Sequence, residues 1–323
     1  MLFYAIMIMS WSSSQYKWGQ YILTYSIEPS FCNKILPNFL EDRILSFHSI
    51  NCDDIKWSIR KSFSAWEYNS DKIKFKEISN TSSDIQIQFR DINRNNVLGT
   101  ATNWRYSENE IVSSVISIDD SYCWYMDNVF CHEISQLNNG NNILKPILFI
   151  LWFLCIGFLV IYQLQHICYY TTPKLMRWKF IITFSMCVTI FIPLVYWGVI
   201  SPCTKCHDFN ILMTHEIGHS IGFGHTDENN NMCGCEHNYS CASDYSSILT
   251  SIVDSRSNAC LSQSDADGLH YKYEEACKPV ICFPSASESY IGYARGMASF
   301  IIPIIISLVI SLAILCIAER KKT

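Results

Sequence analysis

Three histidines and a glutamate within eleven residues form the stretch of this sequence best suited to chemistry. His215 and His219 are four residues apart, so on a helix both imidazoles project from one face and can bind one metal ion. Glu216 lies beside the first histidine, where a carboxylate can accept a proton from water that the metal activates. Gly222 permits a sharp turn after that helix, which brings His225 back as a third ligand. Three protein ligands and one open position are typical of a catalytic zinc site.

The flanking segments extend this pattern. The spacing HExxHxxGxxH is the metzincin signature, and the chain around it resembles the matrixin family. The matching segments are Trp18 with Leu23–Ile27, Phe63–Trp66, Asp84–Phe89, Ile118–Asp119 with Trp124, and Leu261–Leu269 with Tyr273. The resemblance covers residues 17–131 and 208–274. It implies an α/β (α+β) metzincin catalytic domain, with a twisted mixed sheet, a catalytic helix and Zn2+ as the catalytic cofactor.

The resemblance also assigns two further elements. The stretch Leu98-Gly99-Thr100-Ala101 resembles the family's edge strand, whose unpaired backbone groups receive an extended substrate; an ordinary sheet edge is the alternative. Leu249 occupies the position of the methionine turn under the zinc, because Met232 is too far from the closing helix. Leucine for methionine is a volume-conserving apolar exchange, so we expect a modest cost.

Two other metal sites of the family are less well supported. Many matrixins bind a second, structural zinc through histidines, but the corresponding positions here carry Thr100 and Ser117. Calcium commonly supports matrixin domains, and Asp119 and Asp120 occupy positions where family ligands occur. Acidic pairs in loops are usually only solvated, so Ca2+ is left unassigned.

The composition points toward membranes and away from nucleic acid. The chain has 323 residues, is 49% hydrophobic and carries a net charge of −5, which gives no electrostatic case for nucleic-acid binding. Pro146–Gln165, Phe180–Pro202 and Gly296–Ala318 are uncharged apolar runs long enough to cross a bilayer. The loop between the first two contains basic but no acidic residues, and basic residues follow the third, which places both on the cytoplasmic side. A translated non-coding insertion is the alternative for the first two runs.

These observations predict a division of the chain into seven parts. They are a signal peptide (1–16), the N-terminal part of the peptidase domain (17–144), a transmembrane hairpin with a cytoplasmic loop at 166–179 or a spurious insertion (145–202), the catalytic helix with the Met-turn-like and closing segments (203–274), an extracellular stalk (275–295), a transmembrane anchor (296–318) and a cytoplasmic tail (319–323). A buried N-terminal strand is the alternative for residues 1–16.

The cysteines agree with an oxidising compartment. Twelve of the 16 lie in segments placed outside the membrane: Cys32, Cys52, Cys123, Cys131, Cys203, Cys206, Cys233, Cys235, Cys241, Cys260, Cys277 and Cys282. A dense and even set favours disulfides. Cys203 and Cys206 have the spacing of half a zinc knuckle, but no second pair at suitable spacing completes it, so disulfides are favoured there too. The sequons at Asn80 and Asn238 are typical of secreted glycoproteins.

The sequence therefore predicts a membrane-anchored, outward-facing zinc endopeptidase, with His215, His219 and His225 as metal ligands and Glu216 as general base. Its partners would be extended polypeptides, such as extracellular matrix or cell-wall proteins, and the membrane. A catalytically silent membrane adhesion or scaffold protein of the same fold is the main alternative. A multi-span transporter is disfavoured, because the apolar runs contain no charged residue that would mark a pathway.

Overall fold

The computed structural model describes residues 16–39, 50–79, 82–94, 96–107, 110–126, 206–225, 247–249 and 260–282, together with the single residues 305 and 309. The chain divides into two compact units, and all of these residues except Ile305 and Val309 belong to the first. In these described ranges no helix has the length and apolar character needed to cross a bilayer. The expected hairpin (145–202) and cytoplasmic tail (319–323) lie outside the described residues, as do nearly all of the expected signal peptide (1–16) and anchor (296–318).

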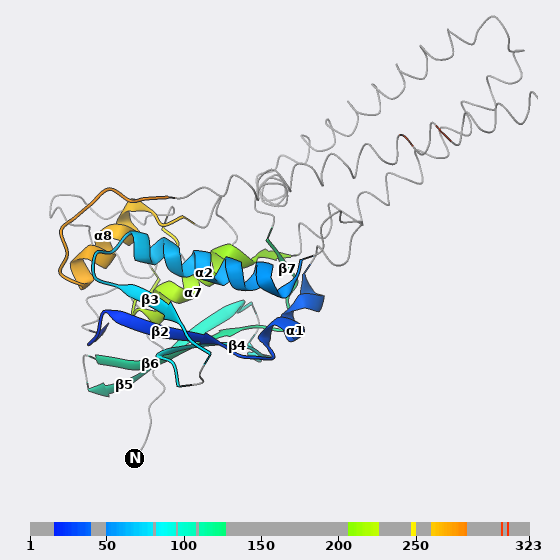
Figure 1. Cartoon of the computed structure of the whole chain (residues 1–323), viewed down its shortest axis with the longest axis horizontal. Helices are drawn as coiled ribbons and strands as arrows, with labels where there is room; N and C mark the ends of the chain where they lie inside the picture. Colours follow the sequence, from blue (N-terminus) through cyan, green and yellow to red (C-terminus); the bar gives the residue numbers. More distant parts are fainter. Residues whose placement is uncertain are drawn as a thin grey trace, which may run out of the picture. The chain divides into compact units, whose positions relative to one another are not determined.

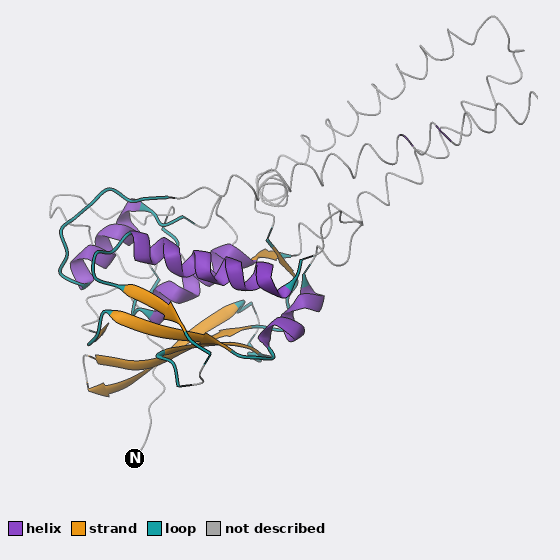
Figure 2. Ribbon diagram, in the orientation of Figure 1, coloured by secondary structure: helices purple, strands orange, loops and turns teal. Residues whose placement is uncertain are grey.

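One layer of the domain is a six-stranded sheet (Figure 2). Its strands are β1 (Lys17–Trp18), β2 (Ile22–Ile27), β3 (Lys74–Glu77), β4 (Ile85–Phe89), β5 (Gly99–Ser107) and β6 (Glu110–Ile118). The order β1-β6-β4-β2-β3 is parallel throughout, whereas β5 pairs antiparallel with β6. Residues 114–118 of β6 pair with β4 and β5 at the same time, so β5 lies at an edge. This mixed sheet agrees with the expected fold class.

The strand sequences match their burial. In β4, Ile85, Ile87 and Phe89 are buried, while the glutamines between them are only half-buried. Alternation with a period of two directs every second side chain toward the helices and the others toward the opposite face of the sheet. The predicted strand at Asp84–Phe89 is therefore confirmed, with β4 itself beginning at Ile85.

The helices form the second layer. They are α1 (Phe31–Ile35) followed by the short 3-10 helix η1 (Leu36–Asn38), α2 (Cys52–Tyr68), α7 (Phe209–Ser220) and α8 (Gln263–Lys272). Figure 1 shows α2 and α7 side by side over one face of the sheet. The start of α2 is fixed by a capping box, in which Asn51 accepts from the N–H of Asp54 and Asp54 accepts from the N–H of Asn51.

Helix α7 is held on all sides, which matters because it carries two of the predicted ligands. Every residue of α7 except His219 is buried. The indole Nε1 of Trp66 in α2 donates to the Thr214 carbonyl at 2.8 Å. A Cβ added at Gly218 would lie 2.7 Å from Trp66 Cζ2, so glycine is what allows the indole to approach the helix so closely. Asp208 caps the N-terminus by accepting from the N–H of Asn210.

The described chain ends on the two sides of the segment 127–205 lie next to each other. Strands β7 (Trp124–Tyr125) and β8 (His207–Asp208) pair in parallel, and the Cys123–Cys206 disulfide lies beside them with 4.5 Å between the Cα atoms. The N–H of His207 donates to the Cys123 carbonyl at 2.9 Å. An insertion at this position therefore begins and ends at adjacent points, immediately before the catalytic helix.

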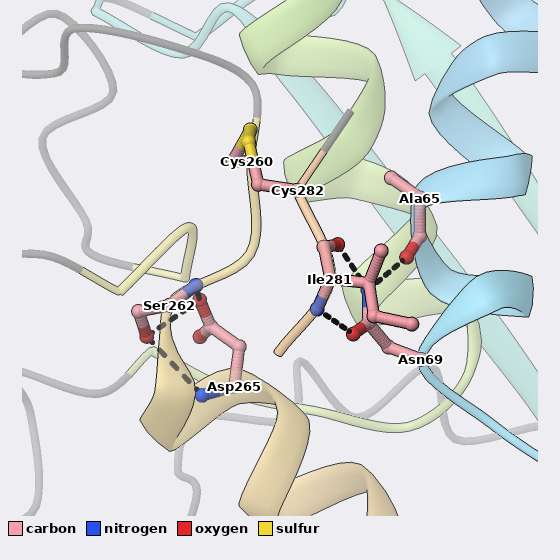
Figure 3. Close-up of a disulfide and its surroundings, with 7 residues drawn as sticks. All are labelled: Ala65, Asn69, Cys260, Ser262, Asp265, Ile281 and Cys282. Atoms are coloured by element: carbon pink, nitrogen blue, oxygen red, sulfur yellow. Dashed lines mark hydrogen bonds between the residues drawn. A yellow bond between two sulfur atoms is a disulfide. The ribbon is translucent and has the colours of Figure 1, made fainter. Parts of the chain in front are cut away.

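Two other disulfides have both cysteines in the described residues. Cys32–Cys52 joins α1 to α2, and Cys260–Cys282 joins the chain on either side of α8 (Figure 3). Cys277 is also disulfide-bonded. For these seven cysteines the predicted disulfides are confirmed, including Cys206 of the CxxC pair. The remaining cysteines of the predicted extracellular set, which are Cys131, Cys203, Cys233, Cys235 and Cys241, lie outside the described residues.

The described chain after α8 follows the surface of the domain as far as Cys282. Asn69, at the end of α2, donates through Nδ2 to the Ala65 and Ile281 carbonyls, and its Oδ1 accepts from the N–H of Ile281 at 2.7 Å (Figure 3). The carboxylate of Glu275 accepts from the N–H groups of Asp71 and Lys72. Residues 275–282, placed in the expected stalk, thus contact the domain, and the rest of that stalk lies outside the described residues.

Replacing both Cys123 and Cys206 by serine should destabilise the domain. The disulfide joins residues 83 apart in sequence, and removing a native disulfide of this kind costs about 2–5 kcal/mol of unfolding free energy. The measurement is the thermal unfolding midpoint of the full chain. An unchanged midpoint would show that β7–β8 pairing alone closes the domain at this position.

Candidate metal centre

The three predicted histidine ligands converge. His215 and His219 lie on α7, and His225 follows the turn after it. The Nε2 atoms of His219 and His215 are 2.9 Å apart, and those of His219 and His225 are 3.1 Å apart. In the described parts of the chain this triad is the only group of three or more His, Cys, Asp or Glu residues arranged to hold a metal ion. Tetrahedral zinc with bonds of about 2.0–2.1 Å separates neighbouring nitrogen ligands by about 3.4 Å. The observed spacing is compatible with such an ion.

The other ring nitrogens decide which tautomer is present. His215 Nδ1 lies 2.7 Å from the Ile248 carbonyl oxygen, and His219 Nδ1 lies 2.8 Å from the Phe223 carbonyl oxygen. Because a carbonyl can only accept, each Nδ1 carries the proton and donates it, which leaves the Nε2 lone pair free for a metal. Burial, with the nearby charge of His225, lowers the pKa of His219 to about 4, so its ring is neutral. The convergent Nε2 atoms of the triad fit a bound cation.

Gly222 produces the turn predicted from its position. Its φ is +94°, in the region that favours glycine. The N–H of Gly222 donates to the His219 carbonyl at 2.9 Å, and the N–H of Phe223 donates to the Gly218 carbonyl at 3.1 Å. These two bonds form a Schellman motif, which ends the helix and reverses the chain toward His225.

Glu216 lies against the edge strand. Its side chain is buried, and its Oε2 has no hydrogen-bond partner among the described residues. Burial raises the pKa of Glu216 to about 8. A Cβ added at Gly99 would lie 2.9 Å from Glu216 Oε1, so the strand can approach this carboxylate only because residue 99 is glycine. The unsatisfied oxygen is free to bind a water molecule or a substrate group.

The predicted substrate-binding stretch lies at the start of the edge strand. Gly99, Thr100 and Ala101 open β5, and Leu98 precedes them, with its carbonyl accepting from the N–H of Asp119 at 3.0 Å. Further along, Asn103 Nδ2 donates to the His219 carbonyl at 2.8 Å. The edge strand is therefore fixed directly to the helix that carries the histidines.

The positions where many matrixins have a second zinc site are direct neighbours. Thr100 and Ser117 are paired across the β5–β6 ladder, and the Ser117 hydroxyl accepts from Gln88 Nε2 at 2.9 Å. They supply hydroxyl groups rather than imidazoles at this place in the sheet. Asp119, considered for calcium, instead accepts from the backbone N–H groups of Ile92 and Ser121.

Leu249 packs directly beneath the catalytic helix. It is fully buried, and its Cδ2 would be 2.5 Å from a Cβ placed on Gly218. The preceding residue, Ile248, supplies the carbonyl that orients His215. The segment 247–249 thus supports the triad in two ways: Leu249 packs against α7, and Ile248 accepts the hydrogen bond from His215. These are contacts at the position of the expected methionine turn.

Asp265 is a supporting residue that the sequence analysis did not identify. Its buried carboxylate accepts from the N–H of Ile248 at 2.7 Å, from the Ser247 hydroxyl and from the N–H of Ser262 at 2.8 Å. The last of these belongs to the capping box of α8 (Figure 3). Burial raises the pKa of Asp265, and these hydrogen bonds oppose the shift. The only signal in the sequence was its place in the segment Leu261–Leu269, which resembles the matrixin family. That resemblance did not indicate which residues Asp265 contacts.

Leu249→Ala should destabilise the domain by about 2–5 kcal/mol, because it leaves a cavity beneath α7, whereas Leu249→Met should cost less than about 1.5 kcal/mol. Equilibrium denaturation of both variants provides the measurement. Equal effects of the two substitutions would mean that this position is not a close-packed support.

Asp265→Asn should weaken both the fold and zinc binding. The amide retains one acceptor oxygen where the carboxylate serves several donors, so buried N–H and O–H groups lose partners at a cost of about 1–3 kcal/mol each. The variant is compared with Asp267→Asn, which removes a half-buried carboxylate from the same helix, where it accepts from Gln263 Nε2. Zinc affinity unchanged in Asp265→Asn would contradict the proposed support of His215 through Ile248.

The comparison with protein families agrees with this geometry. The model of the matrixin family matches residues 43–274, which is more than half of the chain and includes the whole histidine triad. A search of curated proteins finds no match. With a family match of this extent, and with the triad, the Schellman turn and the mixed sheet arranged as described, the chain belongs to the matrixin family.

Proposed function

We propose that the protein is a zinc-dependent endopeptidase that hydrolyses extended polypeptides. Membership of the matrixin family implies a metallopeptidase. The observation that carries the proposal is the convergence of three imidazole Nε2 atoms, two of them on rings whose Nδ1 atoms are bonded to carbonyls. An intact ligand set with both tautomers fixed is what a working zinc site requires.

His215, His219 and His225 would hold the ion, and Glu216 would manage the protons. A zinc ion bound there supplies Lewis-acid polarisation of the scissile carbonyl and a lower pKa for the attacking water. Glu216 accepts the proton of that water on a carboxylate oxygen and then donates it to the nitrogen of the leaving amine. The burial of Glu216 and its unpaired Oε2 suit this role, because no protein donor competes for the oxygen in the described residues.

The substrate would lie as an added strand along β5. In the described sheet β5 pairs on one side only, with β6, so backbone groups on its other side can pair with a polypeptide. Gly99 lies against Glu216, and together with Leu98, Thr100 and Ala101 it would align the scissile bond. Recognition by main-chain hydrogen bonds selects extended peptide over folded protein.

We further propose that the peptidase domain acts outside the cell on a membrane-anchored chain. The three disulfides support an oxidising compartment. The apolar runs at 145–202 and 296–318 support anchoring, and the described chain on either side of 127–205 ends at the β7–β8 pair. Substrates in that location are extracellular proteins, including matrix or cell-wall components.

Glu216→Gln should retain zinc and lose peptide hydrolysis by a factor of about 10²–10⁴, which is the usual contribution of a general base. His219→Ala is the matched control, because it should lose zinc and activity together. The measurements are zinc content and cleavage of a peptide library. Full activity in Glu216→Gln would refute the mechanism, and zinc binding without cleavage in the parent protein would favour a silent scaffold.

A further inference from the structure

The end of the catalytic helix is held by an unusual set of donors. Four consecutive carbonyls at the C-terminus of α7 each accept a hydrogen bond from a side chain on a different part of the domain. These bonds are Asn103 Nδ2 to His219 O at 2.8 Å, Trp18 Nε1 to Ser220 O at 3.0 Å, Tyr273 OH to Ile221 O at 3.1 Å and Lys272 Nζ to Gly222 O at 2.6 Å. The last carbonyls of a helix normally lack partners. Here strand β1, strand β5 and the end of α8 satisfy them, and the turn is fixed from three directions.

Lys272 makes the most direct contact with the turn. Its Nζ donates to the carbonyl of Gly222, the residue with positive φ, and lies 5.0 Å from the centre of the Phe223 ring. The same ring is stacked on Trp66, with 5.5 Å between the ring centres. The Phe223 carbonyl in turn orients His219, and His225 follows two residues later. The ammonium therefore contacts two of the residues that connect His219 to His225.

The turn at Gly222 is closely packed against Lys272 and its other neighbours. A Cβ placed on Gly222 would lie 2.9 Å from Lys272 Nζ, 2.7 Å from the Tyr16 carbonyl oxygen and 3.0 Å from Ile111 Cδ1. The ammonium fills one side of a closely packed turn. A cation at this point is also favoured by the partial negative charge at the end of the helix.

The hydrogen bond from Lys272 to the Gly222 carbonyl does not neutralise a buried negative charge. No carboxylate in the described residues acts on Lys272, and burial, together with the positive charges of Arg105 and Lys17, lowers the pKa of Lys272 to about 7. The half-buried amine is therefore costly to keep charged, and an apolar side chain of similar length could pack in its place. An apolar side chain could not donate a hydrogen bond to the Gly222 carbonyl.

We propose that Lys272 is a positioning residue for the metal site, which fixes the Gly222–Phe223 peptide and thereby the placement of His225 relative to His219. This inference rests on the proposed function, because it assumes that the triad binds zinc. Lys272 acts through the turn, by its hydrogen bond to the Gly222 carbonyl.

The test compares Lys272→Met, which keeps the length and removes the donor, with Lys272→Arg, which keeps a cationic donor. Lys278→Met is the control, since Lys278 is exposed and pairs with Asp71 away from α7. Each full-length variant is measured for zinc affinity by chelator competition, for the visible absorption of its cobalt-substituted form, and for unfolding of its metal-free form.

We expect Lys272→Met to bind zinc about tenfold to a hundredfold more weakly, as the loss of a charged hydrogen bond implies, and to show an altered cobalt spectrum. Its metal-free form should unfold near the parent temperature, Lys272→Arg should restore most of the affinity, and Lys278→Met should behave as the parent. Parent-like affinity and spectrum in Lys272→Met would overturn the inference, and so would loss of the metal-free fold, which would make the role structural. A parent protein that binds no zinc at the triad would instead refute the proposed function itself.

Discussion

The hydrogen bond between His215 Nδ1 and the Ile248 carbonyl connects the chemistry of the site to the packing of the whole domain. It fixes the tautomer of a metal ligand, yet its acceptor lies in a separate segment that is held only by tertiary contacts. The N–H of Ile248 is bound by Asp265, and Asp265 belongs to the capping box of α8. The orientation of the first ligand thus depends on where α8 begins. Each link buries a polar group that would be costly without its partner.

The same dependence explains why the catalytic helix is buried on almost every side. A helix on the surface of a domain buries one apolar stripe. Helix α7 is instead surrounded by α2, the sheet and the segment 247–249. Its C-terminus receives donors from Asn103, Trp18, Tyr273 and Lys272. The positions of His215, His219 and His225 are consequently set by the tertiary fold, and a local helix of this sequence would not hold them.

The parts of this arrangement that could be predicted from sequence are those with local causes. The i, i+4 spacing of His215 and His219 and the glycine at 222 follow from helix geometry and backbone freedom, and the alternation in β4 follows from the pleat of a strand. The roles of Asp265 and Lys272 could not be predicted in this way. Both lie on a short helix that reads as an ordinary polar surface, and their partners are 17 and 50 residues away. Disulfide pairing likewise depends on which cysteines the fold brings together.

The segment 127–205 separates the two parts of the peptidase domain in the sequence, immediately before the catalytic helix. The described chain shows that residues 126 and 206 both adjoin the β7–β8 pair, where Cys123 and Cys206 are bonded. Because closure entropy grows only slowly with length, a long segment between adjacent points adds little cost to the fold. Among the described residues, the hydrogen bonds that orient His215 and His219 and fix the Gly222 turn come from residues outside this segment. A matrixin core can therefore close around this segment, and the interruption gives no physical reason to expect a silent site.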